Sequence, residues 1–242
     1  METTLENLSP NTTYYVRGYA INESGSAYSN QISFKTWEGS VNDASGNIYA
    51  YKTIGSQIWI TRNLETTKFN DESIIPNVQD DLLWGYTSTS ANCTYTKYGK
   101  LYNYYAVVDN RKLCPTGWHV PSDSDWKILE TFLGMNPDQL DAIGLRGTDE
   151  GGKLKYTIIS IYDGWNFPNT GATNSVGFSA RGSGYRSDNG IFTNENISAN
   201  FWSNSEFDAN SAWGRVLNYN NSQIIRLNVK KGYGFSVRCL KD

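Results

Sequence analysis

Few side chains in this sequence are able to do covalent or acid–base chemistry. The 242 residues include one histidine, His119, and three cysteines, Cys93, Cys114 and Cys239. An activated nucleophile needs a base within hydrogen-bonding reach, and His119 lies between apolar residues on an apparent strand that leads into a helix. A structural role is favoured for His119 over a role as base or ligand. We therefore predict that the protein is not an enzyme.

Acidic side chains are more numerous, but no pattern among them specifies a site. Carboxylate pairs for glycoside hydrolysis can be chosen in many ways among the 24 Asp and Glu residues. Asp80-Asp81 and Asp149-Glu150 offer oxygen ligands for Ca²⁺, yet they lack the alternating Asp/Asn spacing of a dedicated calcium loop. Solvated turns are favoured at both places. We predict no metal site and no cofactor, with calcium as the alternative.

Aromatic and amide side chains are abundant and suit recognition. The chain has 17 Tyr and 8 Trp with a net charge of -3, which argues against a nucleic-acid partner because phosphate binding needs a concentrated basic face. Tyr and Trp faces stack on sugar rings or pack against a protein, and Asn is both donor and acceptor. The predicted contact residues for a glycan or surface protein lie in the C-terminal half: Tyr185, Arg186, Asn189, Trp202, Asn204, Trp213, Arg215, Tyr219, Asn220 and Asn221.

A structural explanation of part of this cluster stays open. Trp202, Trp213 and Arg215 would also suit positions that pack beneath long loops. Residues 219–221 are expected to be exposed and are better candidates for direct contact.

The elements that must position these residues are mostly short strands. Alternation over Ile48–Ile54, a Gly55-Ser56 turn and the return over Gln57–Thr61 predict a hairpin, with Trp59 in the core. Beyond Gly152 the chain is rich in Gly, Asn, Ser and aromatic residues, which is typical of a loop-rich β region. Short strands are predicted near 178–181, 213–218, 223–229 and 234–240.

The clearest helix is predicted to begin after Ser122, which can cap it, and to end at Gly134. Apolar residues at 126, 129, 132 and 133 should share one face of this helix. A second short helix is expected around 138–143. Residues 98–107 are ambiguous between strand and helix, and a short helix is favoured.

The first 37 residues form a separate pattern. Two alternating runs flank a polar turn at residues 22–25, which predicts an antiparallel hairpin. The stretch resembles the last third of a fibronectin type III domain, with Tyr14 at the position of the tyrosine corner and Asn11 replacing a glycine. A complete module needs about seven strands, so residues 1–37 are expected to be a partial module with an uncovered edge. Either it belongs to a longer multi-module protein, or the hairpin packs on the domain that follows.

Residues 41–242 contain several short motifs in a fixed order. The motifs span residues 58–64, 98–103, 113–121, 168–174, 184–186, 201–203 and 234–239. On these motifs the segment resembles the Fibrobacter succinogenes major paralogous domain, a family of secreted or surface bacterial modules.

That family is in turn similar to the C-type lectin-like fold and to the formylglycine-generating enzyme fold. In those folds one short sequence motif leads into a helix, a second motif forms a strand and a third motif closes the sheet. The three motifs are matched in order by residues 119–126, 182–185 and 234–237. The resemblance implies an α+β, C-type lectin-like fold that is rich in loops, with short antiparallel strands and one or two helices.

The resemblance also bears on the cysteines. Cys114 precedes the helix and Cys239 ends the last strand, as in the disulfide of lectin-like folds, so a Cys114–Cys239 bond is implied. In the chain-entropy model, closing a loop of about 125 residues stabilises the fold by roughly 4–5 kcal/mol. Cys93 is then expected to be a semi-buried free thiol, which is favoured over an intermolecular bond.

The chain departs from the enzymes of this fold. No cysteine pair matches their active-site thiols, and the single histidine excludes the His clusters of iron-dependent relatives. Trp202-Ser203-Asn204 is similar to the Trp-Asn-Asp calcium triplet of sugar-binding lectins at its first position only. No calcium ligand is therefore predicted there.

We expect a non-enzymatic extracellular recognition or adhesion module of a bacterial surface or secreted protein, which binds a glycan or protein through its loop face. The alternatives are a structural spacer without a ligand and a formylglycine-generating-type oxidase. No window of about 18 apolar residues predicts a membrane span. Residues 1–20 also lack the features of a secretory signal, as expected if the sequence begins inside a module. An extracellular or cell-surface location, with the anchor outside this chain, is expected.

Overall fold

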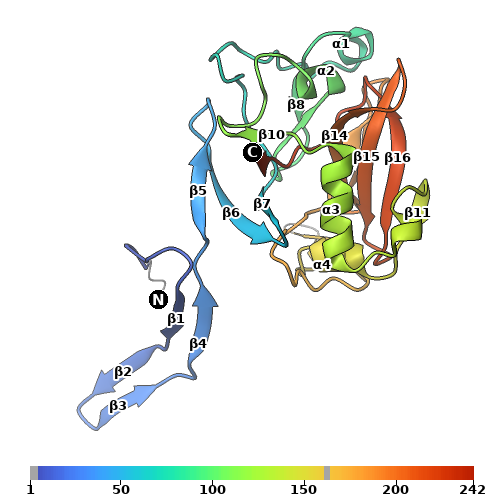
Figure 1. The fold of residues 1–242 in the computed structure, drawn as a ribbon. Helices are drawn as coiled ribbons and strands as arrows, with labels where there is room; N and C mark the ends of the chain where they lie inside the picture. The colour runs from blue at the N-terminus through green and yellow to red at the C-terminus, as the bar shows by residue number, and fades with distance from the viewer. Residues whose placement is uncertain (1–4, 161–163) are drawn as a thin grey trace.

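A computed structural model describes residues 5–160 and 164–242, so the first four residues of the predicted 1–37 module lie outside it. The main domain contains a five-stranded sheet and a six-stranded sheet with short helices around them (Figure 1). A narrow β-ribbon at the N-terminal end extends away from this domain. The α+β class predicted from the sequence is confirmed.

The N-terminal ribbon is the predicted antiparallel hairpin. Its pairs are β1 with β4 and β2 with β3, and every residue of β2 and β3 is exposed. The expectation that the hairpin packs on the following domain is therefore wrong for these two strands. The Tyr14 hydroxyl accepts a hydrogen bond from the backbone N–H of Ser9 at 2.8 Å, which secures the base of the ribbon. The strands are β1 (Thr13–Val16), β2 (Tyr19–Asn22), β3 (Gly25–Tyr28) and β4 (Ile32–Lys35).

The five-stranded sheet joins the two ends of the main domain. Its order is β10-β17-β7-β6-β5, so the last strand lies between the predicted hairpin and β10. The hairpin is confirmed, and Trp59 is fully buried. The prediction of a strand over 234–240 is wrong, because residues 234–236 form only isolated bridges and strand pairing resumes at Leu240. The strands are β5 (Gly39–Asn42), β6 (Ile48–Ile54), β7 (Gln57–Ile60), β10 (Trp118–His119) and β17 (Leu240–Lys241).

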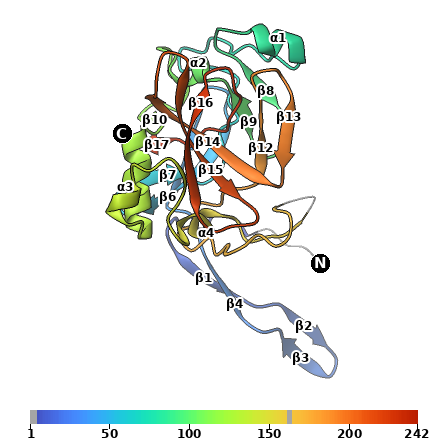
Figure 2. The same cartoon turned by 90° about the vertical axis from the view of Figure 1, so that its right-hand side faces the viewer.

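The six-stranded sheet has the order β11-β16-β15-β14-β12-β13 (Figure 2). All its pairs are antiparallel except β12 with β14. The strands predicted near 213–218 and 223–229 are confirmed, whereas 178–181 contributes one bridge and no strand. A separate pair is β8 (Asn92–Thr94) with β9 (Lys100–Tyr102). The sheet consists of β11 (Gly144–Arg146), β12 (Ser183–Arg186), β13 (Phe192–Glu195), β14 (Ser198–Glu206), β15 (Ser211–Asn218) and β16 (Ile224–Lys230).

The predicted helix is α3 (Asp123–Leu133). The Ser122 side chain and Asp125 form a reciprocal capping box, and Gly134 ends the helix with a φ of 106°. Trp126, Leu129 and Leu133 are buried as expected. Phe132 was expected on the same face but is 55% exposed, because position 132 lies at the edge of that stripe.

The expectation of one or two helices is wrong, since the described residues contain four α-helices. Two of them, with six and five residues, were not predicted, because they are too short for a 3.6-residue pattern to be recognised. The short helix favoured within 98–107 is confirmed at residues 104–107. The ambiguous 98–107 segment is β9 followed by a helix, and the helix expected around 138–143 is one 3₁₀ turn at Pro137–Gln139. The additional helices are α1 (Asp81–Tyr86), α2 (Tyr104–Val107) and α4 (Glu150–Leu154).

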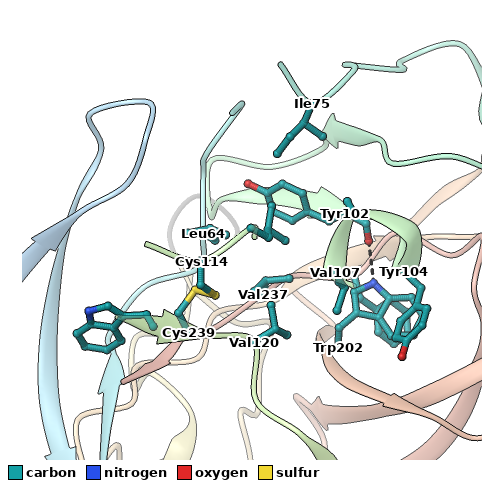
Figure 3. Close-up of a cluster of buried hydrophobic side chains, with 14 of the residues drawn as sticks. Leu64, Ile75, Tyr102, Tyr104, Val107, Cys114, Val120, Trp202, Val237 and Cys239 are labelled. Carbon is teal, nitrogen blue, oxygen red and sulfur yellow. Dashed lines mark hydrogen bonds between the residues drawn. A yellow bond between two sulfur atoms is a disulfide. The ribbon is translucent and has the colours of Figure 1, made fainter. Parts of the chain in front are cut away.

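A disulfide joins Cys114 to Cys239 within a buried cluster, as the resemblance implied (Figure 3). In the same cluster the Trp202 indole donates a hydrogen bond of 2.7 Å to the carbonyl oxygen of Tyr102. Cys93 is a buried free thiol, and burial raises its pKa to about 11, so it stays protonated at neutral pH. The cluster connects the segment before α3 to the chain just before β17.

A buried network of charges attaches α3 to three strands of the six-stranded sheet. One oxygen of Glu130 accepts from Arg146 of β11 at 2.7 Å and from Arg215 of β15 at 2.6 Å. Asp123 pairs with Arg215 at 2.9 Å and with Arg226 of β16 at 2.8 Å. Burial alone would raise the pKa of Asp123, but the hydrogen bonds from Arg226 and the charge of Arg215 hold it well below its usual range.

Removing the Glu130 charge should destabilise the domain strongly. Glu130→Gln leaves two buried guanidinium groups with less compensation, and the free energy of unfolding should fall by about 3–5 kcal/mol. Urea denaturation at neutral pH measures this loss. The matched control is Asp141→Asn, which removes an exposed partner of Lys127 and should change stability little. Equal losses in the two variants would contradict a central role for the network.

Loss of the disulfide should also lower stability. The double variant Cys114→Ser/Cys239→Ser is expected to lose about 2–5 kcal/mol, because its unfolded chain is no longer constrained. Thermal and urea unfolding of the variant and of the oxidised wild type measure the difference. Thiol titration of the denatured, oxidised protein should find only the Cys93 thiol. Three reactive thiols in that sample, one for each cysteine of the chain, would show that the bond does not form.

Candidate functional site

The candidate site is a hollow on the face of the six-stranded sheet that is opposite α3. Side chains alternate along each strand, so Phe201, Leu217 and Ile224 join the core beneath α3. Their neighbours on the other face are in register across three strands, with Asn200 beside Val216 and Val216 beside Ile225. A continuous row of side chains from β14, β15 and β16 therefore forms the floor of the hollow.

Aromatic rings form one wall of the hollow. Tyr185 of β12 is stacked on Tyr233, with ring centroids 5.9 Å apart, and meets the edge of Phe235 at the same distance. The enclosed volume is about 390 Å³, within the usual range for small-molecule sites. The lining residues, which define the sheet hollow, are Tyr185, Asn194, Ser198, Asn200, Val216, Asn218, Ile225, Leu227, Asn228, Val229, Lys230, Tyr233 and Phe235.

Several polar groups in the sheet hollow are not used by the scaffold. Among the described residues, the side chains of Asn218, Tyr185 and Tyr233 make no hydrogen bond to another residue, although all three are half-buried. Asn200 differs, because its amide donates to the Gly184 carbonyl at 3.0 Å and to a serine hydroxyl. The side chains of Asn218, Tyr185 and Tyr233 therefore keep their hydrogen-bond donors and acceptors for water or a ligand.

The sheet hollow is almost free of charge. Lys230 is its one charged lining residue, and the Lys230 ammonium pairs with Asp188 at 2.7 Å. Burial and the nearby Asp188 raise the pKa of Tyr233, so its phenol remains a hydrogen-bond donor at neutral pH. The arrangement therefore suits an uncharged ligand with an apolar part and several hydroxyl or amide groups.

Three residues predicted to contact a ligand are buried inside the scaffold. Arg186 is fully buried, where it donates to the carbonyls of residues 78, 79 and 190 and lies between the rings of Trp84 and Phe192. Trp202 belongs to the disulfide cluster and Arg215 to the charge network. These three side chains have no surface to offer to a ligand.

Two further predicted residues are mainly structural. The Asn204 amide donates to the carbonyl of Val120 at 2.8 Å, which joins β14 to the segment before α3. Trp213 is half-buried and its ring lies beneath the guanidinium of Arg226, 3.4 Å from the ring centroid. Neither of these two side chains lines the sheet hollow.

The remaining predicted residues lie in surface loops. Asn189 and Asn220 are exposed, whereas Tyr219 and Asn221 are half-buried, and none of the four lines the sheet hollow. Tyr185 is the predicted residue that does line it. The residues that sequence reasoning missed include Asn194, Asn218, Leu227 and Tyr233. Side-chain alternation along 214–218 and 225–229 was the signal that would have placed five of the lining positions on one face: 216, 218, 225, 227 and 229.

The acids considered for calcium serve local structure. Asp80 caps α1 and Asp81 pairs with Arg186, while Asp149 pairs with Lys153. Within residues 5–160 and 164–242 no three His, Cys, Asp or Glu side chains gather in a way that would hold a metal ion. At the surface, His119 Nδ1 is hydrogen-bonded to the Asp242 carboxylate at 2.6 Å, and the ring lies 3.5 Å from Asp125.

These features define a disulfide-closed α+β module with a neutral hollow on one sheet. The chain belongs to the Fibrobacter succinogenes major domain family, whose model matches residues 53–241. A search of curated proteins and a search of solved structures each gave no match. Every helix in the described part of the chain is too short or too polar to cross a lipid bilayer.

Lys155 holds the loop that carries the predicted residues 219–221. Its ammonium group is buried and donates to the backbone carbonyls of Thr170, Asn218 and Asn221 at 2.8–2.9 Å. Burial lowers the Lys155 pKa from 10.5 to about 8. The lysine therefore positions the end of β15, where Asn218 lies.

The Lys155 pKa predicts how stability depends on pH. Between pH 8 and 10.5 the unfolded chain retains the Lys155 proton more than the folded chain does, so stability should rise with pH in this window. The contribution is up to about 1.4 kcal/mol per pH unit. Urea denaturation of wild type and Lys155→Met at a series of pH values isolates it by difference. The same pH slope in both proteins would contradict the assignment.

Proposed function

We propose that the chain is a non-enzymatic recognition or adhesion module of an extracellular or cell-surface bacterial protein, and that it binds a glycan or a protein partner in the sheet hollow. The observation that carries this proposal is the combination of an aromatic wall with unused hydrogen-bonding groups on Asn218, Tyr185 and Tyr233. A rigid sheet beneath these groups keeps them preorganised, so little order is lost on binding.

The extracellular location is supported by the disulfide, since such bonds persist in oxidising compartments. A C-type lectin-like arrangement agrees with two features. Helix α3 follows Cys114, and the last strand, β17, lies inside the five-stranded sheet. A partial fibronectin type III module agrees with the ribbon and with the Tyr14 hydrogen bond to Ser9. Together these features support the proposal of one module within a surface protein of several modules.

A binding screen with matched variants tests the proposed function. The purified chain is applied to an array of glycans and of bacterial and host surface proteins. Tyr185→Phe and Asn218→Ala should each weaken binding roughly 2- to 12-fold, since each removes a hydrogen-bonding group without disturbing packing. Asn220→Ala is the control, because Asn220 is exposed and outside the sheet hollow.

Three results would contradict the proposal in different ways. Absence of binding to every arrayed ligand would favour a spacer without a ligand. Loss of binding in Asn220→Ala but not in Asn218→Ala would move the site to the loop at 219–221. Oxidation of a cysteine-containing peptide by the purified chain would instead support an enzyme related to the formylglycine-generating proteins.

A further inference from the structure

We propose that the sheet hollow selects an uncharged sugar ring that carries an N-acetyl group. This inference rests on the recognition function proposed above and names its ligand class. It starts from charge: the Lys230 ammonium is paired with Asp188, and no other lining residue is ionised at neutral pH. Sugars with carboxylate, sulfate or phosphate groups would lose water without gaining a counter-charge in the sheet hollow.

The apolar part of the floor calls for a methyl group on the ligand. Val216, Ile225 and Leu227 lie side by side on β15 and β16, with Val216 paired to Ile225 and Leu227 paired to Gly214. Gly214 allows the Phe235 ring to approach the floor, because a Cβ at this position would lie 3.2 Å from the ring. A plain hexose would place hydroxyl groups against these aliphatic side chains. An acetyl methyl group would bury apolar surface there instead.

The polar groups above this floor match the rest of an acetamido group. Asn218 presents one amide, which can donate to the acetyl carbonyl and accept from the acetamido N–H. Asn218 is paired with Ser198 across β14, so it lies on the same face of the sheet as Val216, two residues away on β15. The Tyr185 and Tyr233 phenols remain for ring hydroxyls. One patch thus provides apolar contact, an amide and two hydroxyl groups.

The size of the sheet hollow favours a sugar over a folded protein surface. Its volume of about 390 Å³ lies near the lower end of the range for ligand pockets, roughly 300–1,000 Å³. One or two sugar rings fit such a space, whereas a protein partner would need a much wider contact area.

Titration with simple glycosides tests this inference on the full chain. The probes are methyl N-acetyl-β-glucosaminide, methyl N-acetyl-β-galactosaminide, methyl β-glucoside and methyl β-glucosaminide, followed by backbone and Asn side-chain NMR shifts. We expect at least one acetylated glycoside to bind about tenfold or more tightly than both non-acetylated glycosides. The largest shifts should fall on residues 216–218 and 225–227.

Variants separate the acetyl contact from the rest of the site. Ile225→Thr keeps a β-branched residue in β16 and replaces the ethyl branch with a hydroxyl, so it should weaken binding of the acetylated probe several-fold and reduce selectivity. Asn218→Ala should weaken it by about tenfold, and Asn220→Ala should leave it unchanged. Unfolding curves of all variants confirm that each remains folded.

The outcomes distinguish the ligand class from the proposed function. Equal affinity for acetylated and non-acetylated glycosides would overturn the acetyl inference, as would shifts outside the sheet hollow. If neither acetylated glycoside binds while Asn218→Ala weakens binding to another arrayed ligand, the acetyl inference fails and the recognition function stands. If no probe and no arrayed ligand binds, both fail.

Discussion

The carboxylate of Glu130 is the interaction on which the arrangement of the main domain depends. It lies on α3, is fully buried, and is reached by guanidinium groups from β11 and β15. Asp123, about two turns earlier on the same helix, extends the contacts to β16. Three strands are therefore held against one helix at fixed positions. Because unpaired buried charges are costly, this arrangement has few alternatives once the helix and the sheet meet.

The network also separates the two faces of the six-stranded sheet. The face beneath α3 carries the arginines, and the opposite face carries Asn200, Val216 and Asn218 in the sheet hollow. Side chains alternate along a strand, so a residue's position relative to its neighbour decides whether it serves the scaffold or faces a ligand. Arg215 and Val216 are adjacent in sequence and belong to opposite faces for this reason.

Sequence patterns predicted the parts of the fold whose signals are local. The capping residues of α3, the β6–β7 hairpin and the ribbon turn depend on neighbours within a few positions, and all were found. The disulfide came from family resemblance rather than from local pattern. The short helices α1 and α4 were missed because they make too few turns. Arg215 could not be placed, since its partner Glu130 is 85 residues away and the bond exists only in the folded chain.

The sequence predicted the types of residue at the candidate site but few of their positions. Choosing Tyr, Trp, Asn and Arg by side-chain type selected Tyr185, which lines the sheet hollow, together with Arg186 and Trp202, whose hydrogen-bonding groups are already used inside the domain. Asn218 lies one residue before the loop that seemed most exposed in the sequence. What distinguishes it is that its side chain makes no hydrogen bond to another described residue, and that property belongs to the structure.

The position of β17 has a mechanical consequence. It lies in the same sheet as β5, β6 and β7. Because neighbouring strands are antiparallel, residues 39 and 241 lie at the same end of this sheet, and a force that pulls them apart would load the hydrogen bonds between the strands one after another. The Cys114–Cys239 bond would then carry the force from the chain before β17 directly to residue 114. Tension would thus bypass the chain between the two cysteines, which contains the six-stranded sheet, and the sheet hollow would keep its shape while the chain is under tension.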